Sequence, residues 1–185
     1  MVRYGSKIQD LFELSKNGAK EERYNALIEL NSTLEQPVDW AYDVWDDLIE
    51  LLSDKDGHQR SRAAQYLSRL AVYSDPEDRI LKDFDALWQV TFDEKFVTAR
   101  HTIQTLWRVG LGSDAAKNLF LEHVIDRFND GDKEKNYTLI RNDFLQGMRN
   151  LYDETHDEVI KAQALELIDS VDDSKYQKKY AQIWK

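Results

Sequence analysis

The strongest constraint on the fold is a pattern of two helices and a tight turn in the first half of the chain. Over residues 38–52, apolar residues recur at the spacing of one buried helical face, at Ala41, Val44, Trp45, Leu48, Leu51 and Leu52. A short turn rich in Asp and Gly follows, and residues 58–73 then form a basic, alanine-rich segment. This pattern predicts two antiparallel helices joined by the turn.

The rest of the chain has the same helical character. Its 185 residues include only two prolines and seven glycines, and no stretch shows the sustained alternation of a strand. Hydrophobic residues make up 42% of the chain, enough for a packed core. We therefore predict an all-α protein of about five antiparallel helix pairs, forming a single domain over residues 1–185.

Several helix ends are marked by polar residues, proline or glycine. We expect N-caps at Ser6, Asp75, Ser113 and Thr155. Pro76 follows Asp75, which favours a helix that begins at the proline. Gly110 and Gly112 are expected to end the helix that precedes Ser113.

The composition excludes some classes of protein. The absence of cysteine rules out a disulfide framework, a zinc–thiolate site and a cysteine nucleophile, and it fits a reducing compartment. No signal peptide and no membrane-spanning segment are expected, because no apolar stretch is long enough. A net charge of -10 disfavours nucleic acid and anionic membranes as partners. We expect an acidic, soluble, cytoplasmic protein.

Two kinds of marker recur with a period near 39 residues. The expected turns carry Asn17, Asp54, Asp93 and Asp132, at successive spacings of 37, 39 and 39. The second helix of each pair carries a basic residue, and successive spacings of 39, 38 and 41 separate Arg23, Arg62, Arg100 and Arg141. The agreement of the two series favours an internal helical repeat.

One unit of this repeat resembles a known family. The run Leu48-Ile49-Glu50-Leu51-Leu52-Ser53-Asp54, followed by Arg62-Ala63-Ala64 and Leu67, is similar to a HEAT repeat. That repeat combines an apolar first helix, a turn Asp and a basic, alanine-containing second helix. The resemblance covers about four of the five pairs. It implies a right-handed α-α superhelix, an armadillo-like α-solenoid in which the second helices line a concave face.

Charge is divided between the two types of helix. Residues 39–52 hold five acids and no base, whereas residues 58–73 hold three arginines and no acid. A concave face lined by second helices would therefore be basic and rich in Arg and Tyr, residues that often anchor protein interfaces. The predicted binding residues on this face are Arg62, Tyr66, Arg69, Arg100, Gln104, Arg108, Tyr137 and Arg141.

Other roles for these residues stay open. In HEAT-type repeats the second-helix arginine often pairs with a turn Asp inside the protein, which would occupy Arg62 and Arg100. Tyr66 has the spacing of a core residue as well. Arg69, Arg108 and Arg141 are harder to assign to a turn acid, so they carry more of the binding hypothesis.

No enzymatic, cofactor-binding or metal-binding motif is expected. Residues 110–115 match a GxGxxA pattern, but a helix precedes them where dinucleotide binding requires a strand. The histidines lack the spacing of metal ligands and the His-Glu pairs of the deoxyhypusine hydroxylases, an enzyme class of the HEAT type. We therefore predict a non-enzymatic protein without a cofactor.

The function predicted from these patterns is a protein-binding scaffold whose Arg/Tyr face takes an acidic segment of a partner. A variant is a small acidic inhibitor or immunity-type protein that covers a basic partner with residues 39–50. The alternative from another class is a nucleic-acid-acting protein of the HEAT-like DNA alkylation-repair type. In that alternative Trp107 would line the cleft with Arg100 and Arg108, although Trp107 also has the spacing of a core residue.

Overall fold

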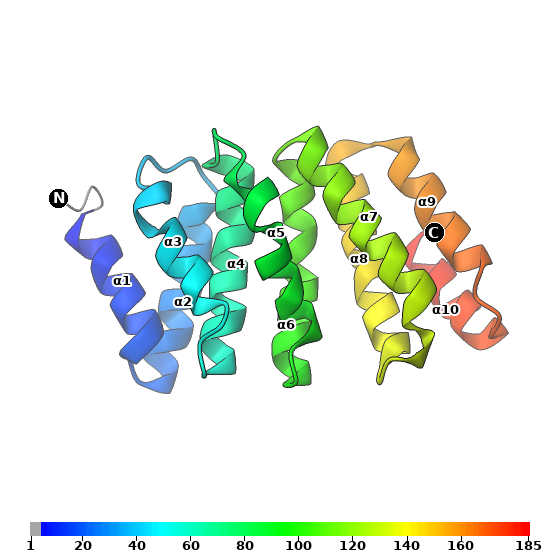
Figure 1. Cartoon of the computed structure of the whole chain (residues 1–185), viewed down its shortest axis with the longest axis horizontal. Coiled ribbons are helices and arrows are strands. Elements are labelled where there is room, and N and C mark those ends of the chain that lie inside the picture. Colours follow the sequence, from blue (N-terminus) through cyan, green and yellow to red (C-terminus); the bar gives the residue numbers. More distant parts are fainter. Residues whose placement is uncertain (1–4) are drawn as a thin grey trace. The chain divides into compact units, whose positions relative to one another are not determined.

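The computed structural model describes residues 5–185, and within them the chain forms ten α-helices, three short 3-10 helices and no strand (Figure 1). The all-α prediction is confirmed. The chain divides into two compact units, an N-terminal unit ending at Thr102 and a C-terminal unit beginning at Ile103. Stacked helical repeats contact mainly their neighbours, so such a division occurs in one continuous array as well as in two domains. The single domain stays a prediction.

The N-terminal unit is built from helices that run antiparallel to their neighbours in the chain (Figure 1). Its helices are α1 (Ser6–Asn17), α2 (Lys20–Leu34), α3 (Ala41–Leu51), α4 (Gly57–Tyr73), α5 (Arg79–Gln89), the 3-10 helix η1 (Val90–Phe92) and the first part of α6 (Phe96–Leu106). Within this unit α1 packs on α2 and α3 packs on α4, while α2 and α4 also contact each other. Helix α5 packs on α3 and α4.

The core of the N-terminal unit consists of the apolar faces of these helices. Large side chains that are fully buried in it include Leu30, Leu34, Trp45, Leu67, Leu70, Phe84 and Leu87. The indole nitrogen of Trp45 donates a hydrogen bond of 2.9 Å to Asp83, so the one polar atom of this buried ring is satisfied. The apolar spacing in residues 38–52 therefore identifies the buried face of α3 correctly.

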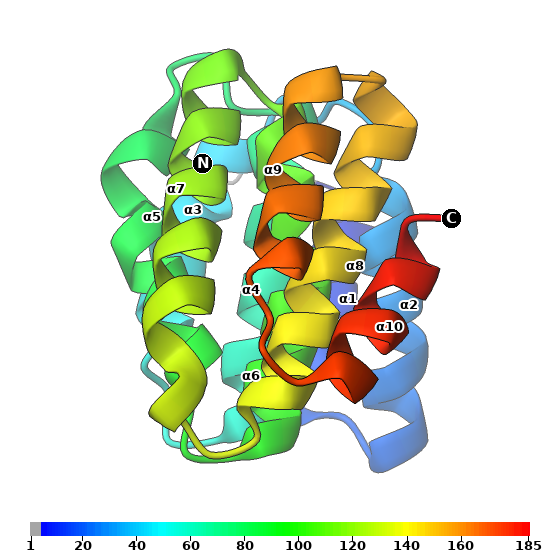
Figure 2. The same ribbon diagram turned by 90° about the vertical axis from the view of Figure 1, so that its right-hand side faces the viewer.

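The C-terminal unit repeats the antiparallel arrangement. It contains the end of α6, η2 (Trp107–Leu111), α7 (Asp114–Asp130), η3 (Gly131–Lys133), α8 (Tyr137–Thr155), α9 (Glu158–Asp169) and α10 (Ser174–Ile183). Helices α8 and α9 lie side by side, and α10 packs against both of them (Figure 2). Tyr180 of α10 is buried, and its hydroxyl donates a hydrogen bond of 2.8 Å to the carbonyl of Thr138.

The predicted helix starts are confirmed at one position and wrong at three. Ser113 caps α7, where its hydroxyl accepts a hydrogen bond from the Ala116 amide. Ser6 is already helical, and the cap of α1 is Gly5. Thr155 belongs to α8, because its hydroxyl donates back to the Leu151 carbonyl; Asp157 caps α9 instead.

The helix predicted to start at Pro76 begins three residues later, at Arg79. Asp75 still serves the helix start, since its carboxylate accepts hydrogen bonds of 2.8 and 2.9 Å from the amides of Arg79 and Ile80. The chain between them closes through Asp78, whose φ of 51° lies in the left-handed region. The predicted N-cap is therefore wrong, because Asp78 occupies that position, although the Asp75 side chain supplies the hydrogen bonds to the first amides of α5.

Candidate protein-interaction groove

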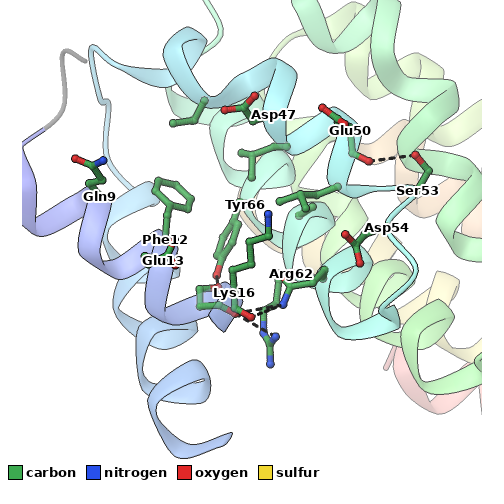
Figure 3. A pocket seen from close by; sticks show the side chains of 16 residues that line it. Gln9, Phe12, Glu13, Lys16, Asp47, Glu50, Ser53, Asp54, Arg62 and Tyr66 are labelled. Atoms are coloured by element: carbon green, nitrogen blue, oxygen red, sulfur yellow. Dashed lines mark hydrogen bonds between the residues drawn. The ribbon is translucent and has the colours of Figure 1, made fainter. Parts of the chain in front are cut away.

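The N-terminal unit contains a groove of about 640 Å³ between α1 and α3, with α4 as its floor (Figure 3). Helix α1 packs chiefly on α2 and α3 chiefly on α4, so the two helices leave space between their facing sides. The groove is thus formed by three helices of one compact unit. Its size lies in the range of ordinary ligand-binding clefts.

The floor of the groove is apolar. It is lined by Phe12, Val44, Leu48, Leu51, Ala63 and Tyr66. Phe12 of α1 stands edge-on to Tyr66 of α4, with ring centroids 5.7 Å apart, and edge-on to Trp40, at 6.0 Å. These aromatic contacts hold the facing side of α1 against the α4 floor.

The rim of the groove is predominantly acidic. Four carboxylates line it, on Glu13, Asp47, Glu50 and Asp54, against the cations of Lys16 and Arg62. Asp47 and Glu50 are exposed on α3, and neither forms an ion pair within residues 5–185. The electrostatic field at the mouth of the groove therefore favours a cationic ligand.

The acidic rim continues along the outer face of α3. Asp39, Asp43 and Asp46 are also exposed and, in the described part of the chain, without an ion-pair partner. We call the set Asp39, Asp43, Asp46, Asp47 and Glu50 the acidic α3 face. Asp43 stands three and four residues before Asp46 and Asp47, and Glu50 stands four and three residues after them, so these four carboxylates share one side of α3. Asp39 lies just before the helix begins.

The lower end of the groove is closed by a clamp between α4 and the last turn of α1. The side-chain amide nitrogen of Gln59, Nε2, donates to the backbone carbonyls of Ser15 and Lys16, at 3.5 and 3.3 Å. The Arg62 guanidinium donates to the Ser15 carbonyl at 3.3 Å. The hydroxyls of Ser15 and Tyr66 share a hydrogen bond of 2.5 Å. These donors satisfy carbonyls that the last helical turn leaves without an intrahelical partner.

The clamp explains the electrostatic state of its members. Burial lowers the pKa of Arg62, and the nearby charge of Arg23 acts in the same direction. Burial raises the pKa of Tyr66 to about 12, although the hydrogen bond to Ser15 and the charge of Arg62 oppose that shift. Tyr66 is 2% exposed and forms part of the groove floor. Arg62 is partly buried and forms part of the groove wall.

The other predicted binding residues of α4, and those of α6 and η2, have contacts within their own units as follows. Arg69 is buried, lies 3.4 Å from the Glu35 carboxylate and donates to the Gln65 carbonyl. Arg100 lies over the ring of Phe96 and Arg108 over the ring of Trp107, at 5.9 and 4.9 Å from the ring centroids. Of the eight predicted residues, Gln104 alone is exposed.

Tyr137 and Arg141 lie together in the C-terminal unit, where they line a second pocket of about 380 Å³. Arg141 donates two hydrogen bonds, of 3.2 and 2.6 Å, to the Phe128 carbonyl near the end of α7. Its guanidinium also lies over the rings of Phe128 and Tyr137. Arg141 thus clamps the end of α7 as Arg62 clamps the end of α1.

Nothing in residues 5–185 points to a metal site, since no three His, Asp or Glu residues gather closely enough to hold an ion. Trp107, considered for a base-binding cleft, is buried, and a Cβ on Gly147 of α8 would lie 3.3 Å from its Cβ. Residues 110–115 end η2 and cap α7, as expected. In the same described part of the chain, no helix is both long and apolar enough to cross a bilayer.

The chain was compared with protein-family models and with curated proteins. No protein-family model matches the chain, and no curated protein matches it as a relative.

The sequence identified the carboxylates of the acidic α3 face, but only as part of an alternative. It did not reveal the groove, because Phe12 and Tyr66 are far apart in the chain and both have the spacing of ordinary core residues. It also missed Gln59 and Ser15, for which neither residue type nor spacing gave a signal.

Proposed function

We propose that the chain is a non-enzymatic helical-repeat protein of the HEAT type that binds a basic protein through the acidic α3 face. The observation that carries this proposal is the state of the five carboxylates on that face. All are exposed and, within the described residues, none has an ion-pair partner. A surface of one charge steers and orients a partner of the opposite charge.

The state of the predicted Arg/Tyr face supports the same choice. Arg62 and Arg141 donate to backbone carbonyls, and Arg69 lies beside Glu35. Binding an acidic partner there would have to compete with these internal contacts. The Arg/Tyr face stays a prediction, and we place the principal surface on α3.

The absence of cysteine from all 185 residues supports a reducing, cytoplasmic location, which we include in the proposal. The charge of the acidic α3 face indicates a basic partner, and the capture experiment below would identify it.

The test is capture of partners from an extract of the source cells after nuclease treatment. The immobilised chain is compared with a variant that carries Asp43→Lys, Asp46→Lys and Asp47→Lys. We expect a basic protein to be recovered by the unmodified chain and lost by the variant. The matched control carries Glu122→Lys, Asp126→Lys and Asp130→Lys, which reverse three exposed acids of α7 and give the same net charge.

The control variant should retain the partner. If both variants lose it equally, net charge and not the acidic α3 face governs binding, and the proposal fails. Partners recovered only from an extract without nuclease treatment would favour the nucleic-acid alternative, for which binding to duplex DNA should weaken steeply with salt.

A further inference from the structure

We infer that the groove between α1 and α3 receives one basic, amphipathic helix of the partner protein, whose apolar side chains insert onto the Phe12–Tyr66 floor. This inference rests on the proposed function and specifies the partner's form. The acidic α3 face alone would suit any basic surface. The groove narrows the choice because it adds an apolar floor beneath an acidic rim.

The first argument is the distribution of polar and apolar groups across the groove. Most of its depth is apolar, with Leu48 and Ala63 buried beside Phe12 and Tyr66, while Ser15 and Gln59 add buried polar groups at its lower end. Gln9, Glu13, Asp47 and Glu50 are exposed along the two edges (Figure 3). A ligand that fits must be apolar on the side it inserts and polar on its flanks. A helix with apolar residues at i, i+3 or i+4 and i+7 has this form, and grooves between helices bind such elements.

The second argument is charge complementarity. Four carboxylates and two cations line the groove, and one of those cations, Arg62, already donates to the Ser15 carbonyl. Asp47 and Glu50 stand at the α3 edge of the mouth (Figure 3). Lysine or arginine side chains on the flank of an inserted helix would lie beside these carboxylates. An acidic helix would meet repulsion along the same edge.

The test uses two defined peptides of about 15 residues, built from Lys, Ala and Leu so that they are helical. One peptide carries leucines at every third or fourth position, and in the other each leucine is replaced by alanine. The lysines and the helix propensity are thereby matched. Affinity for the whole chain is measured by fluorescence anisotropy at about 0.15 M salt, where weak surface attraction is screened.

We expect the leucine peptide to bind at least about tenfold more tightly than the alanine peptide, because one buried leucine contributes roughly that factor. Gln9→Trp, at the α1 edge of the groove, should then weaken binding of the leucine peptide at least about tenfold by filling the groove. Asn25→Trp is the matched control, because it adds the same ring at an exposed amide outside the groove.

The chain's lack of cysteine allows the binding position to be checked directly. Glu50→Cys places a single thiol at the α3 edge, and Glu166→Cys places one on the exposed side of α9. The leucine peptide should slow alkylation of the first thiol and leave the second unchanged.

Three results would overturn the inference. If both peptides bind equally and the triple reversal on α3 weakens both, the acidic α3 face binds basic partners without the groove, and only the proposed function stands. If the leucine peptide binds more tightly but Gln9→Trp has no effect, its apolar side chains insert elsewhere. If neither peptide binds below about 1 mM, the groove does not accept a basic amphipathic helix.

Discussion

The guanidinium of Arg60 holds both carboxylate oxygens of Asp93, with Nε 2.5 Å from Oδ2 and Nη2 2.9 Å from Oδ1. The remaining nitrogen of the fork, Nη1, donates to the Asp54 carbonyl at 2.6 Å. The side chains are 12% and 6% exposed. This pair ties the first turn of α4 to the loop that precedes α6, and it links two of the repeating turn residues through one arginine.

The first prediction concerns this pair. Arg60→Met leaves the Asp93 carboxylate buried without its partner, and we expect the N-terminal unit to lose about 3 kcal/mol of unfolding free energy. Native-state hydrogen exchange measures the change and assigns it to that unit. Lys7→Met breaks an exposed ion pair with Glu29 and should have no measurable effect. If Arg60→Met costs no more unfolding free energy than Lys7→Met, the Arg60–Asp93 contact is not stabilising.

The second prediction is the acid dependence of the same unit. Burial acts to raise the pKa of Asp93, but hydrogen bonds from Arg60 and the Lys95 amide outweigh it and hold the pKa below its usual value. The unfolded chain therefore takes up this proton at higher pH than the folded chain.

Above the ordinary carboxyl pKa of about 4 the stabilisation is fully present, and it is lost as the pH falls through the lowered pKa. Asp93→Asn should flatten the acid side of a plot of unfolding free energy against pH. An unchanged acid slope in this variant would assign the loss to other carboxylates.

The third prediction separates two roles of Arg62. As a clamp on the Ser15 carbonyl it contributes about 1 kcal/mol to stability, so Arg62→Met should lower the unfolding free energy by that amount. As a binding residue it would change partner affinity and leave stability unchanged. Both quantities are measured on the same variant, with Gln104→Met as the exposed comparison among the predicted residues.

The fourth prediction concerns tyrosine ionisation. Burial raises the pKa values of Tyr42, Tyr66 and Tyr180 to about 12, and at Tyr42 the hydrogen bond to Asp75 adds to that effect. In an alkaline absorbance titration these three should ionise at a higher pH than tyrosines of an unfolded chain, whose pKa is about 10. Tyr66→Phe should remove one equivalent from the late phase.

The linked effect on stability has a definite sign. The unfolded chain releases these phenol protons first, so the unfolding free energy falls as the pH rises above about 10. A single titration phase for all nine tyrosines would contradict the burial of these rings.

The fifth prediction tests packing in the C-terminal unit. A Cβ on Gly110 would lie 2.8 Å from a methyl carbon of Leu151. Gly110→Ala should therefore destabilise that unit by about 1–3 kcal/mol through overpacking. Adding Leu151→Ala makes space for the new methyl, so the double variant should cost less than the sum of the two single changes.

The fold was largely predictable because its signal is local. Apolar spacing within each segment defined the helices, and the helix expected over residues 58–73 is observed as α4, Gly57–Tyr73. The predicted helix starts near Asp75 and Thr155 were wrong. The Asp75 carboxylate reaches across a turn, and the Thr155 hydroxyl bonds backward within α8. Residue type alone does not distinguish these contacts from an ordinary N-cap.

The site was much less predictable because it depends on pairings between distant segments. An internal pair between a second-helix arginine and a turn Asp was anticipated on Arg62 or Arg100, yet Asp93 is held by Arg60. Arg60 and Arg62 project in different directions from α4, and their spacing in the sequence does not show which of them faces Asp93. The groove between α1 and α3 likewise exists because those helices pack on other partners.

The clamps on helix ends have a consequence for chain length. Gln59 and Arg62 hold the final carbonyls of α1, and Arg141 holds one near the end of α7. One additional turn in either helix would move its terminal carbonyls by about 5.4 Å, beyond reach of these donors. The lengths of α1 and α7 are therefore constrained by residues that lie on other helices. Insertions inside α1 or α7 should be tolerated far less well than insertions in a connection that carries no clamp.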